Sequence, residues 1–557
     1  MCGKAVLERL RLSLTEVGKA VGIIYRVTVS YIVEKHLKNP LSNVFNEYIL
    51  HLSVKKVNKN GIISVKREIS CHESLFFGAL LTYPTKCVKI KRLVTNIKEM
   101  QKVENVKSRE NVMGTMSIPK LLISMSVPII ISMLVQALYN IVDSIFVAQF
   151  DNVAGTGALT IAFPIQNLMI AVSVGLAVGT SALLSRSLGQ KNFEKANVIA
   201  GQGFFLTACG YVIFLLVGLF FLPLYVGSQT GADGGLLYDY SVDYLSIICI
   251  CSFGVFLQVV TEKLLQSTGK SLLSMTIQLS GALLNLILDP IFIFVLDLGV
   301  AGAAWATVIG QIGAGLLGII LNLLYNKEIR LLLRNFIPKL NIIKEILIIG
   351  IPSVIMQAIG SVMTFSMNKI LIGFSNESMN VFGIYFKIQS FVFMPIFGLT
   401  SGMVPIVAYN YGAKRRDRVF AAIKLSAILS VSYMALGCLI FQTIPGVLLS
   451  MFNATAEMLA IGKIALRVIS ISFILAGFGI ICSTTCQALG RSVYSMLISA
   501  GRQLLALIPA AYLLSLTGTV DAVWWAFPIA EIVSLIIAIY FLIRVLKKCF
   551  PRDIVEK

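Results

Sequence analysis

The sequence predicts an all-α polytopic membrane protein with twelve transmembrane helices in two pseudo-symmetric six-helix lobes. The 557 residues are 57% hydrophobic and only 13% charged, with a mean hydropathy of +0.85. A soluble protein of this length needs far more charge on its surface. Apolar runs repeatedly reach the roughly 20 residues that span a hydrocarbon core. These runs are continuous and lack the alternation expected of barrel strands. In addition, the two halves of the chain resemble each other.

Residues 1–115 form a basic N-terminal extension that differs from the rest of the chain. They carry 20 Lys or Arg against nine Asp or Glu, a net charge of +11. Their apolar segments are too short to span a membrane, and no secretory signal pattern is present. We expect translation of the natural protein to start at Met100, so that residues 1–99 are not translated. The alternative is a genuine accessory extension that binds a membrane surface or a partner.

Twelve apolar runs follow, separated by Gly, Pro, Asn and charged residues. The first lobe is expected at residues 116–325 and the second at 342–546. A cytoplasmic linker at 326–341 joins them, and a cytoplasmic tail follows at 547–557. The predicted spans are 120–149, 158–183, 197–223, 241–265, 271–296, 300–325, 344–373, 381–409, 419–445, 461–487, 492–515 and 522–546.

The loops between these spans alternate in charge. One set contains no Lys or Arg and includes "QFDNVAG", "LDLG", "GFSNESMN" and "SLTGTVD". The other set is basic and includes "SRSLGQKNFEK", "NKEIRLLLRNFIPK" and "YGAKRRDR". This alternation is the positive-inside pattern, and it predicts a multi-pass protein of the cell membrane with both termini in the cytoplasm. The basic loops are therefore topology signals, and we expect no nucleic-acid partner.

An internal repeat relates the two halves. The stretch "PIQNLMIAVSVGLAVGTSALLSRSLGQKN" at 164–192 aligns without gaps to "KIQSFVFMPIFGLTSGMVPIVAYNYGAKR" at 387–415. Because each half has six spans, corresponding segments have the same orientation, which makes this a parallel repeat. Two such bundles predict a V-shaped body that rocks between inward-open and outward-open states. The matched residues are Gln166, Gly175, Gly179, Gly189 and Lys191 with Gln389, Gly398, Gly402, Gly412 and Lys414.

Three acidic residues lie inside predicted spans of the first half, at Asp143, Glu262 and Asp289. A charged side chain at the bilayer centre costs about 2.5–3.5 kcal/mol on insertion scales, so such residues are candidates for function. Helical spacing places Asp143 at the end of a polar face on an otherwise apolar helix. That face also carries Gln136, Tyr139 and Asn140.

Asn285 and Asp289 are four residues apart and share a face of the fifth span, and Thr307 lies early in the sixth. These groups and Asp143 are expected to converge within the first bundle. Their oxygens suit Na⁺, which is the only metal ion predicted here. A proton is the alternative, because burial and a second nearby carboxylate both favour the neutral form of a carboxyl group.

A purely structural role is the alternative for each acid, with hydrogen bonds to a neighbouring helix. Asp289 precedes Pro290 and would then help to manage a break in the helix. Glu262 stands beside Lys263 and would then belong to a paired or interfacial charge.

The second half has a different set of polar residues. The positions that match Glu262 and Asp289 are Ser483 and Ala510, and another acid, Glu531, lies in the last span. Met363 and Met367 belong to a methionine-rich region of the seventh span. A methionine wall suits substrates of variable shape, although gap-filling in a helical core explains the same residues.

The residues in these segments resemble the multidrug and toxic compound extrusion (MATE) family, and in particular its MepA-type and DinF-type bacterial branch. The resemblance rests on "SVPIIISMLVQALYNIVDSIFVAQF", "TEKLLQSTGKSLLSM", "LNLILDPIFIF" and "GVAGAAWATVIGQ". It covers roughly residues 116–546, with both halves in order. The first 99 residues have no counterpart in it.

The resemblance implies a transporter that exports amphipathic, often cationic compounds in exchange for inward H⁺ or Na⁺. The family pattern assigns the first-lobe cation site to Tyr139, Asp143, Asn285, Asp289 and Thr307. The proline where the first span bends in some members corresponds to Pro128. Glu262 matches an acidic position that is linked to drug handling in MepA-type members. Gln136 and Asn140 on the polar face of the first span, and Met363 and Met367 in the seventh, are predicted as further substrate contacts from their positions.

Two other functions compete with multidrug efflux. A flippase for lipid-linked oligosaccharides, from the same wider superfamily, handles anionic substrates that favour a basic cavity. An intramembrane enzyme is a more distant alternative, since there is no HExxH motif, no His after residue 72 and no nucleophile with a nearby base. We therefore predict a monomeric transporter that is not an enzyme and needs no cofactor besides the coupling ion.

Overall fold

The computed structural model describes residues 111–151, 154–230, 235–452 and 454–551. The chain divides after Lys107, and all of the described residues belong to the unit Ser108–Lys557. The predictions for residues 1–99 lie outside the described residues.

The described residues are helical almost throughout. The first half contains α5 (Val112–Thr115), α6 (Ile118–Phe150), α7 (Ala154–Gly189), α8 (Phe193–Leu216), η2 (Val217–Phe221), α9 (Leu222–Thr230), α10 (Gly235–Ile250), α11 (Phe253–Ser267), α12 (Ser271–Pro290), η3 (Ile291–Val295) and α13 (Gly299–Tyr325). The second half contains η4 (Leu333–Phe336), α14 (Leu340–Ile372), α15 (Asn376–Gly412), α16 (Arg416–Thr443), α17 (Pro445–Ser450), α18 (Ala456–Ser470), α19 (Ser472–Ala488), α20 (Ser492–Ala500), η5 (Gly501–Leu507), α21 (Ile508–Ser515), α22 (Val520–Trp524) and α23 (Ala526–Cys549).

Twelve spans can be counted in these helices. Ten helical segments are long and apolar enough to cross a membrane, and two bent pairs supply the remaining spans. The bent pairs are α10 with α11, at 45°, and α18 with α19, at 44°. They are the fourth span of each half, so the repeat extends to the same bend at the same place. The predicted twelve-helix fold is confirmed.

The repeat also extends to unusual backbone conformations. Lys191 and Lys414, which the sequence alignment pairs, both adopt the left-handed conformation, with φ of 59° and 58°. This conformation is uncommon for residues other than glycine. In each case it ends a helix through the same turn, in which the second residue past the helix end reaches back to a carbonyl. The amide of Asn192 donates to Ser187 at 3.0 Å, and the amide of Arg415 donates to Asn410 at 2.9 Å.

The two lobes contact each other through equivalent helices, since α7 packs against α14 and α15 packs against α6. The contacts are reciprocal at the ends of α7 and α15. A Cβ atom added to Gly189 would lie 2.0 Å from the carbonyl oxygen of Tyr409, and one added to Gly412 would lie 2.1 Å from that of Arg186. Only glycine permits this close backbone approach. The lobes therefore meet about a pseudo-two-fold axis.

The three largest hydrophobic cores of the described residues correspond to this arrangement. One lies within the first lobe and one within the second. The third is built by both lobes together and includes Met125, Leu184, Met403 and Ile406. Burial of these side chains holds the lobes together at one end. Moving one Leu, Ile or Met side chain from water into such a core contributes about 1.5–3 kcal/mol of stabilising free energy.

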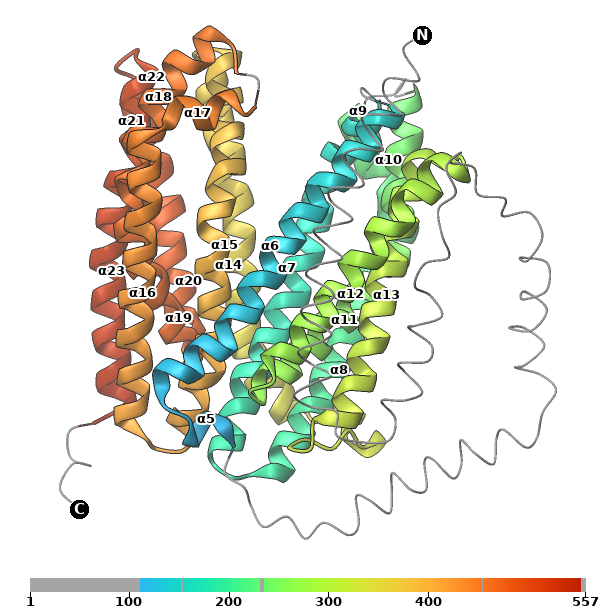
Figure 1. Cartoon of the computed structure of the whole chain (residues 1–557), viewed down its shortest axis with the longest axis vertical. Coiled ribbons are helices and arrows are strands. Elements are labelled where there is room, and N and C mark those ends of the chain that lie inside the picture. The colour runs from blue at the N-terminus through green and yellow to red at the C-terminus, as the bar shows by residue number, and fades with distance from the viewer. Residues whose placement is uncertain (1–110, 152–153, 231–234, 453, 552–557) are drawn as a thin grey trace, which may run out of the picture. The chain divides into compact units, whose positions relative to one another are not determined.

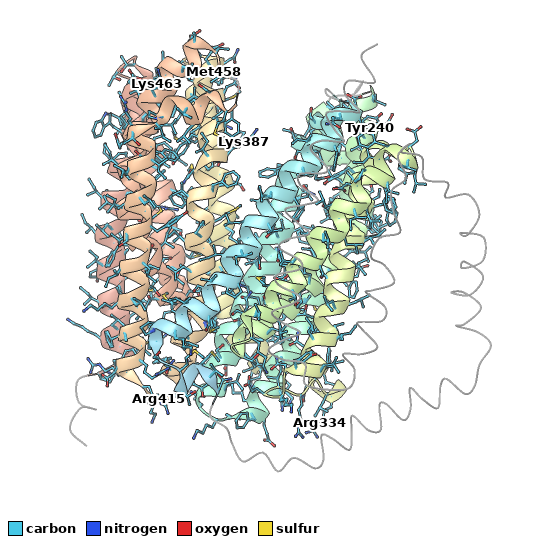
Figure 2. All side chains as sticks on the ribbon, viewed as in Figure 1. Tyr240, Arg334, Lys387, Arg415, Met458 and Lys463 are labelled. Carbon is cyan, nitrogen blue, oxygen red and sulfur yellow. The ribbon has the colours of Figure 1, made fainter. Side chains whose placement is uncertain are left out.

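The shared core lies at the end where the basic loops gather. Within the described unit, the helices of the two lobes run close together near α5 and separate toward α9 and α10 on one side and α17 and α18 on the other (Figure 1). Arg334 and Arg415 lie at the converging end, and Tyr240, Met458 and Lys463 lie at the opposite one (Figure 2). The converging end is thus the one that the loop charges assign to the cytoplasm.

Candidate cation and substrate site in the first lobe

The predicted cation site is built by three neighbouring helices of the first lobe. Asp143 lies on α6, Asn285 and Asp289 on α12, and Thr307 on α13. The helix α12 packs against both α6 and α13, which brings the three sets of side chains to one place. Directly after Asp289, Pro290 lacks a backbone N–H group, and the wider turns of η3 follow.

Asn285 is the hub of the hydrogen bonds at this site. Its Nδ2 donates to Oδ1 of Asp289 at 3.1 Å and to Oγ1 of Thr307 at 3.3 Å. Asn285 is 3% exposed, and Asp289 is fully buried. The spacing of four residues on one helix and the contact across to α13 are both as the sequence predicts. The structure therefore brings these three residues together.

Several oxygens at the site are left without a partner. Among the described residues, Oδ1 of Asp143, Oδ1 of Asn285 and Oδ2 of Asp289 are buried and accept no hydrogen bond. Asp143 lies on α6, which packs against the helix α12 that carries Asp289. Buried oxygens without partners are rare because each loses its hydration without compensation. A bound cation or proton supplies that compensation.

Two further residues adjoin the acids and were not predicted from the sequence as site residues. Gln166 on α7 donates through Nε2 to the hydroxyl of Tyr244 on α10 at 3.1 Å. Tyr244 is 2% exposed and shares a hydrophobic core with Phe146 and Val147, which follow Asp143 on α6. Gln166 was visible as a repeat residue only. Tyr244 carried no signal, because tyrosines near span ends are common in membrane proteins.

Glu262 lies in a second polar group, made largely of amides. Nε2 of Gln258 donates to Oε1 of Glu262 at 2.9 Å. With its amide nitrogen turned toward Glu262, Gln278 donates to the same oxygen at 2.9 Å, while its oxygen lies 2.8 Å from the Gln136 amide. The neighbouring Lys263 donates instead to Gln266, at 2.8 Å. Glu262 is thus held by amides on its own helix and on α12, and Gln136 connects it to α6.

Tyr139 lies on α6 between Gln136 and Asp143, about one helical turn from each. The polar face predicted for the first span therefore faces into the lobe. The side chain of Asn140, predicted on the same face, lies outside the described residues.

The predicted methionine contacts lie in the other lobe. Met367 is fully buried in the hydrophobic core of the second lobe, and Met363 packs against that core while partly buried. The structure does not bring either residue to the acids. The intramembrane charge of this lobe lies elsewhere, where Nη1 of Arg502 on η5 donates to Oε1 of Glu531 on α23 at 3.0 Å. Arg502 was missed because a single Arg in an apolar run resembles a loop signal.

Comparison with known proteins supplies independent evidence of the family to which this chain belongs. A family model described as MatE matches residues 128–291 and 352–513. The chain is 29% identical over 415 residues to a protein of Staphylococcus haemolyticus named "Multidrug export protein MepA", which covers 74% of this chain and 90% of that relative.

Solved structures share the fold. The structure described as "Crystal structure of MATE in complex with MaL6" aligns with a TM-score of 0.74 and 25% identity, covering 79% of this chain and 100% of that one. A second, described as "Outward-facing conformation of a multidrug resistance MATE family transporter of the MOP superfamily", aligns with a TM-score of 0.74 and 24% identity, covering 80% and 99%.

Proposed function

The chain belongs to the MatE family, and from that premise we propose that it is a secondary active multidrug efflux transporter that exchanges amphipathic, cationic compounds for H⁺ or Na⁺. The relatives named as multidrug export proteins support the efflux activity. The observation that carries ion coupling is the set of unpartnered buried oxygens on Asp143, Asn285 and Asp289. These oxygens lie on two adjoining helices, α6 and α12, and the Thr307 hydroxyl on α13 lies 3.3 Å from the Asn285 amide.

The acids couple the ion to the drug through charge. In the outward-open state the site loads H⁺ or Na⁺, which neutralises the first lobe. A cationic drug is then held less tightly and leaves outward. After the lobes rock, the ion is released to the cytoplasm. Each ligand shifts the equilibrium between the two states only by its difference in affinity for them. Coupling therefore requires that ion binding change the affinity for the drug, and that drug binding change the affinity for the ion.

Glu262 and its amides form the proposed drug contact on the same lobe. Gln258 and Gln278 give the Glu262 carboxyl group adaptable hydrogen-bonding partners, and Gln136 contacts Gln278. Tyr139 lies on α6 between Gln136 and Asp143, about one helical turn from each. A buried acid favours cationic drugs, which supports efflux over an anionic lipid-linked oligosaccharide as substrate. Met363 and Met367 stay a prediction as substrate contacts in the second lobe.

The orientation in the membrane follows the loop charges. We place both termini in the cytoplasm, at the end where Arg334 and Arg415 lie (Figure 2). The first and last described segments meet at that end, since Arg415 binds the carbonyl of Gly114 and Tyr411 packs on Phe550. Lys and Arg are retained on the cytoplasmic side during insertion.

Dye transport in proteoliposomes tests this function, with a pH gradient and a Na⁺ gradient imposed separately. We expect one of the two gradients to drive uptake into inside-out vesicles. Asp143→Asn and Asp289→Asn should each reduce driven uptake at least about tenfold, within the range of typical coupling energies. Asp297→Asn is the matched control, because Asp297 is exposed on the loop before α13. Uptake at the wild-type rate in both site variants would exclude a role of these acids in ion coupling. If neither gradient drives uptake by the wild-type protein, the proposed transport function is wrong.

A further inference from the structure

A cavity on the cytoplasmic side is lined by residues of both lobes and is separate from the acids of the first lobe. It measures about 320 Å³ and is lined by Arg186, Ser187, Gln190 and Lys195 from the first lobe, with Leu183 beneath them. The second lobe contributes Glu345, Ile348, Ile349 and Gly490. An adjoining cavity of about 540 Å³ shares Lys195 and is lined by Val198, Lys339, Leu340, Asn341 and Ile342.

Three cationic residues line these cavities. Arg186 and Lys195 are held through their charged groups, and Lys339 is held through its backbone. The Arg186 guanidinium stacks over the Tyr411 ring at 4.9 Å. Nζ of Lys195 bonds Oε2 of Glu345 at 2.7 Å. The backbone amide of Lys339 donates to Oε1 of Gln202 at 2.9 Å, which fixes the linker beside α8.

The positive charge exceeds the negative charge at this place. Glu345 is the acid in the lining, against Arg186, Lys195 and Lys339. Arg491 follows Gly490 of the lining in the sequence and is a fourth cationic residue near this place. An anion with more than one oxygen is the ligand that such a group of guanidinium and ammonium donors binds best.

The same cavities also expose apolar surface. Ile348 is 50% exposed and Leu340 is 79% exposed, one in the lining of each cavity. Both lie in the N-terminal part of α14, where the span enters the membrane from the side of the basic loops. A free phosphate ion makes no use of such surface, but an acyl chain does. Basic pockets between membrane helices on the cytoplasmic side bind anionic lipid headgroups.

We propose that these two cavities bind an anionic phospholipid, with its phosphodiester at Lys195, Arg186 and Lys339 and its acyl chains along Ile348 and Leu340. Because the lining comes from both lobes, the lipid binds the arrangement in which the lobes are closed at this end. It therefore stabilises that state over the one open to the cytoplasm. The proposal requires that this end of the protein lie at the membrane surface, and it does not depend on which compound is exported.

Glu345 distinguishes lipid binding from a simple salt bridge between the lobes. In the lipid hypothesis Glu345 competes with the phosphodiester for Lys195, so removing its charge strengthens binding. If the pair serves only to join the lobes, loss of either partner has the same effect. Lys195→Gln and Glu345→Gln are therefore expected to act in opposite directions on lipid binding.

The test is a titration of the purified full-length protein with short-chain phosphatidylglycerol, phosphatidylcholine of the same chain length, and inorganic phosphate. Bound lipid is measured by native mass spectrometry and by the rise in melting temperature. We expect phosphatidylglycerol to bind, Lys195→Gln and Lys339→Gln to weaken binding about fivefold each, and Glu345→Gln to tighten it. Lys195→Arg keeps the charge and should retain binding, and Lys548→Gln is the matched control, because Lys548 is exposed at the same end on α23.

Four results would overturn the proposal. Phosphatidylcholine binding as tightly as phosphatidylglycerol would remove the role of the headgroup charge. Inorganic phosphate stabilising the protein equally well would make the site a free-anion site. Equal weakening by Lys548→Gln would indicate general surface charge. Lower binding with Glu345→Gln, parallel to Lys195→Gln, would leave only a salt bridge between the lobes.

Discussion

The two lobes share one backbone arrangement but treat their buried acids in opposite ways. In the first lobe, Asp143 and Asp289 keep oxygens without partners and have no cation beside them among the described residues. In the second lobe, Glu531 is paired with Arg502 at 3.0 Å. Removing one partner from a buried pair is costly, but the intact pair is nearly neutral. The first lobe is thus open to a mobile cation, while the second carries its own counterion.

The difference lies in side chains and not in the path of the chain. The left-handed turns at Lys191 and Lys414 and the bends at the fourth span of each lobe are the same. A repeated body supplies the symmetric motion of two halves. In the proposed mechanism, the unequal acids make ion binding change the charge of the first lobe only.

The largest expected effect comes from comparing Asp289→Asn with Glu531→Gln in transport. Asp289→Asn should lower ion-driven drug transport at least about tenfold. Glu531→Gln should leave transport coupled, with a change of less than about twofold in the number of ions exchanged per drug. Ion and drug fluxes measured in the same proteoliposomes check this. If Glu531→Gln uncouples transport as strongly, the second lobe takes part in coupling and the comparison between the lobes fails.

Stability should respond in the reverse order. Arg502→Met leaves Glu531 buried without its partner, which we expect to cost about 3–5 kcal/mol of unfolding free energy. The double variant Arg502→Met with Glu531→Gln should recover most of that loss. Asp143→Asn, the matched change in the first lobe, should cost little, because it removes no ion pair. Unfolding in mixed detergent micelles measures the free energy of unfolding of all three variants. If the losses of Arg502→Met and Glu531→Gln simply add in the double variant, the two residues do not stabilise the protein as a pair.

The interface glycines should give equal effects, because they are related by the pseudo-two-fold axis. Gly189→Ala and Gly412→Ala each place a Cβ atom against a backbone carbonyl of the other lobe. Each should destabilise the end at which the two lobes converge by about 1–3 kcal/mol, as overpacking does. Gly479→Ala is the control, since a Cβ atom added to Gly479 would have nothing within 4 Å among the described residues. Accessibility of cytoplasmic cysteine labels reports opening, and strongly unequal effects would show that the interface is not symmetric.

The smallest expected effect is that of Thr307→Val. The variant removes the hydroxyl that accepts from Asn285, a bond worth about 0.5–1.5 kcal/mol, so ion affinity should fall by roughly two- to tenfold. The matching position in the second lobe is Phe527, which has no such group. Thr364→Val is the control, because the Thr364 hydroxyl donates within its own helix to Gly360. Binding of the coupling ion measured by calorimetry checks the shift, and an unchanged affinity would exclude Thr307 from the site.

Much of the cation site was predictable from the sequence. Asn285 and Asp289 are four residues apart on one helix, so their contact follows from helical spacing alone. The contact between Asn285 and Thr307 was also expected, because consecutive spans usually pack together. Substrate contacts were harder to predict. Met367 looks the same on a cavity wall as in a core, and only the packing of the second lobe places it inside.

The sequence by itself determined the twelve spans, the alternating loop charges and the repeat, because each is a property of the chain read over about 20 residues at a time. The tertiary structure decided which polar groups find partners. Gln278 meets Gln136 across 142 positions of the chain, and Arg502 meets Glu531 across 29. No local pattern contains such pairings, since they depend on how whole helices pack. For that reason the acids were visible in the sequence, but the difference between an open acid and a paired one was not.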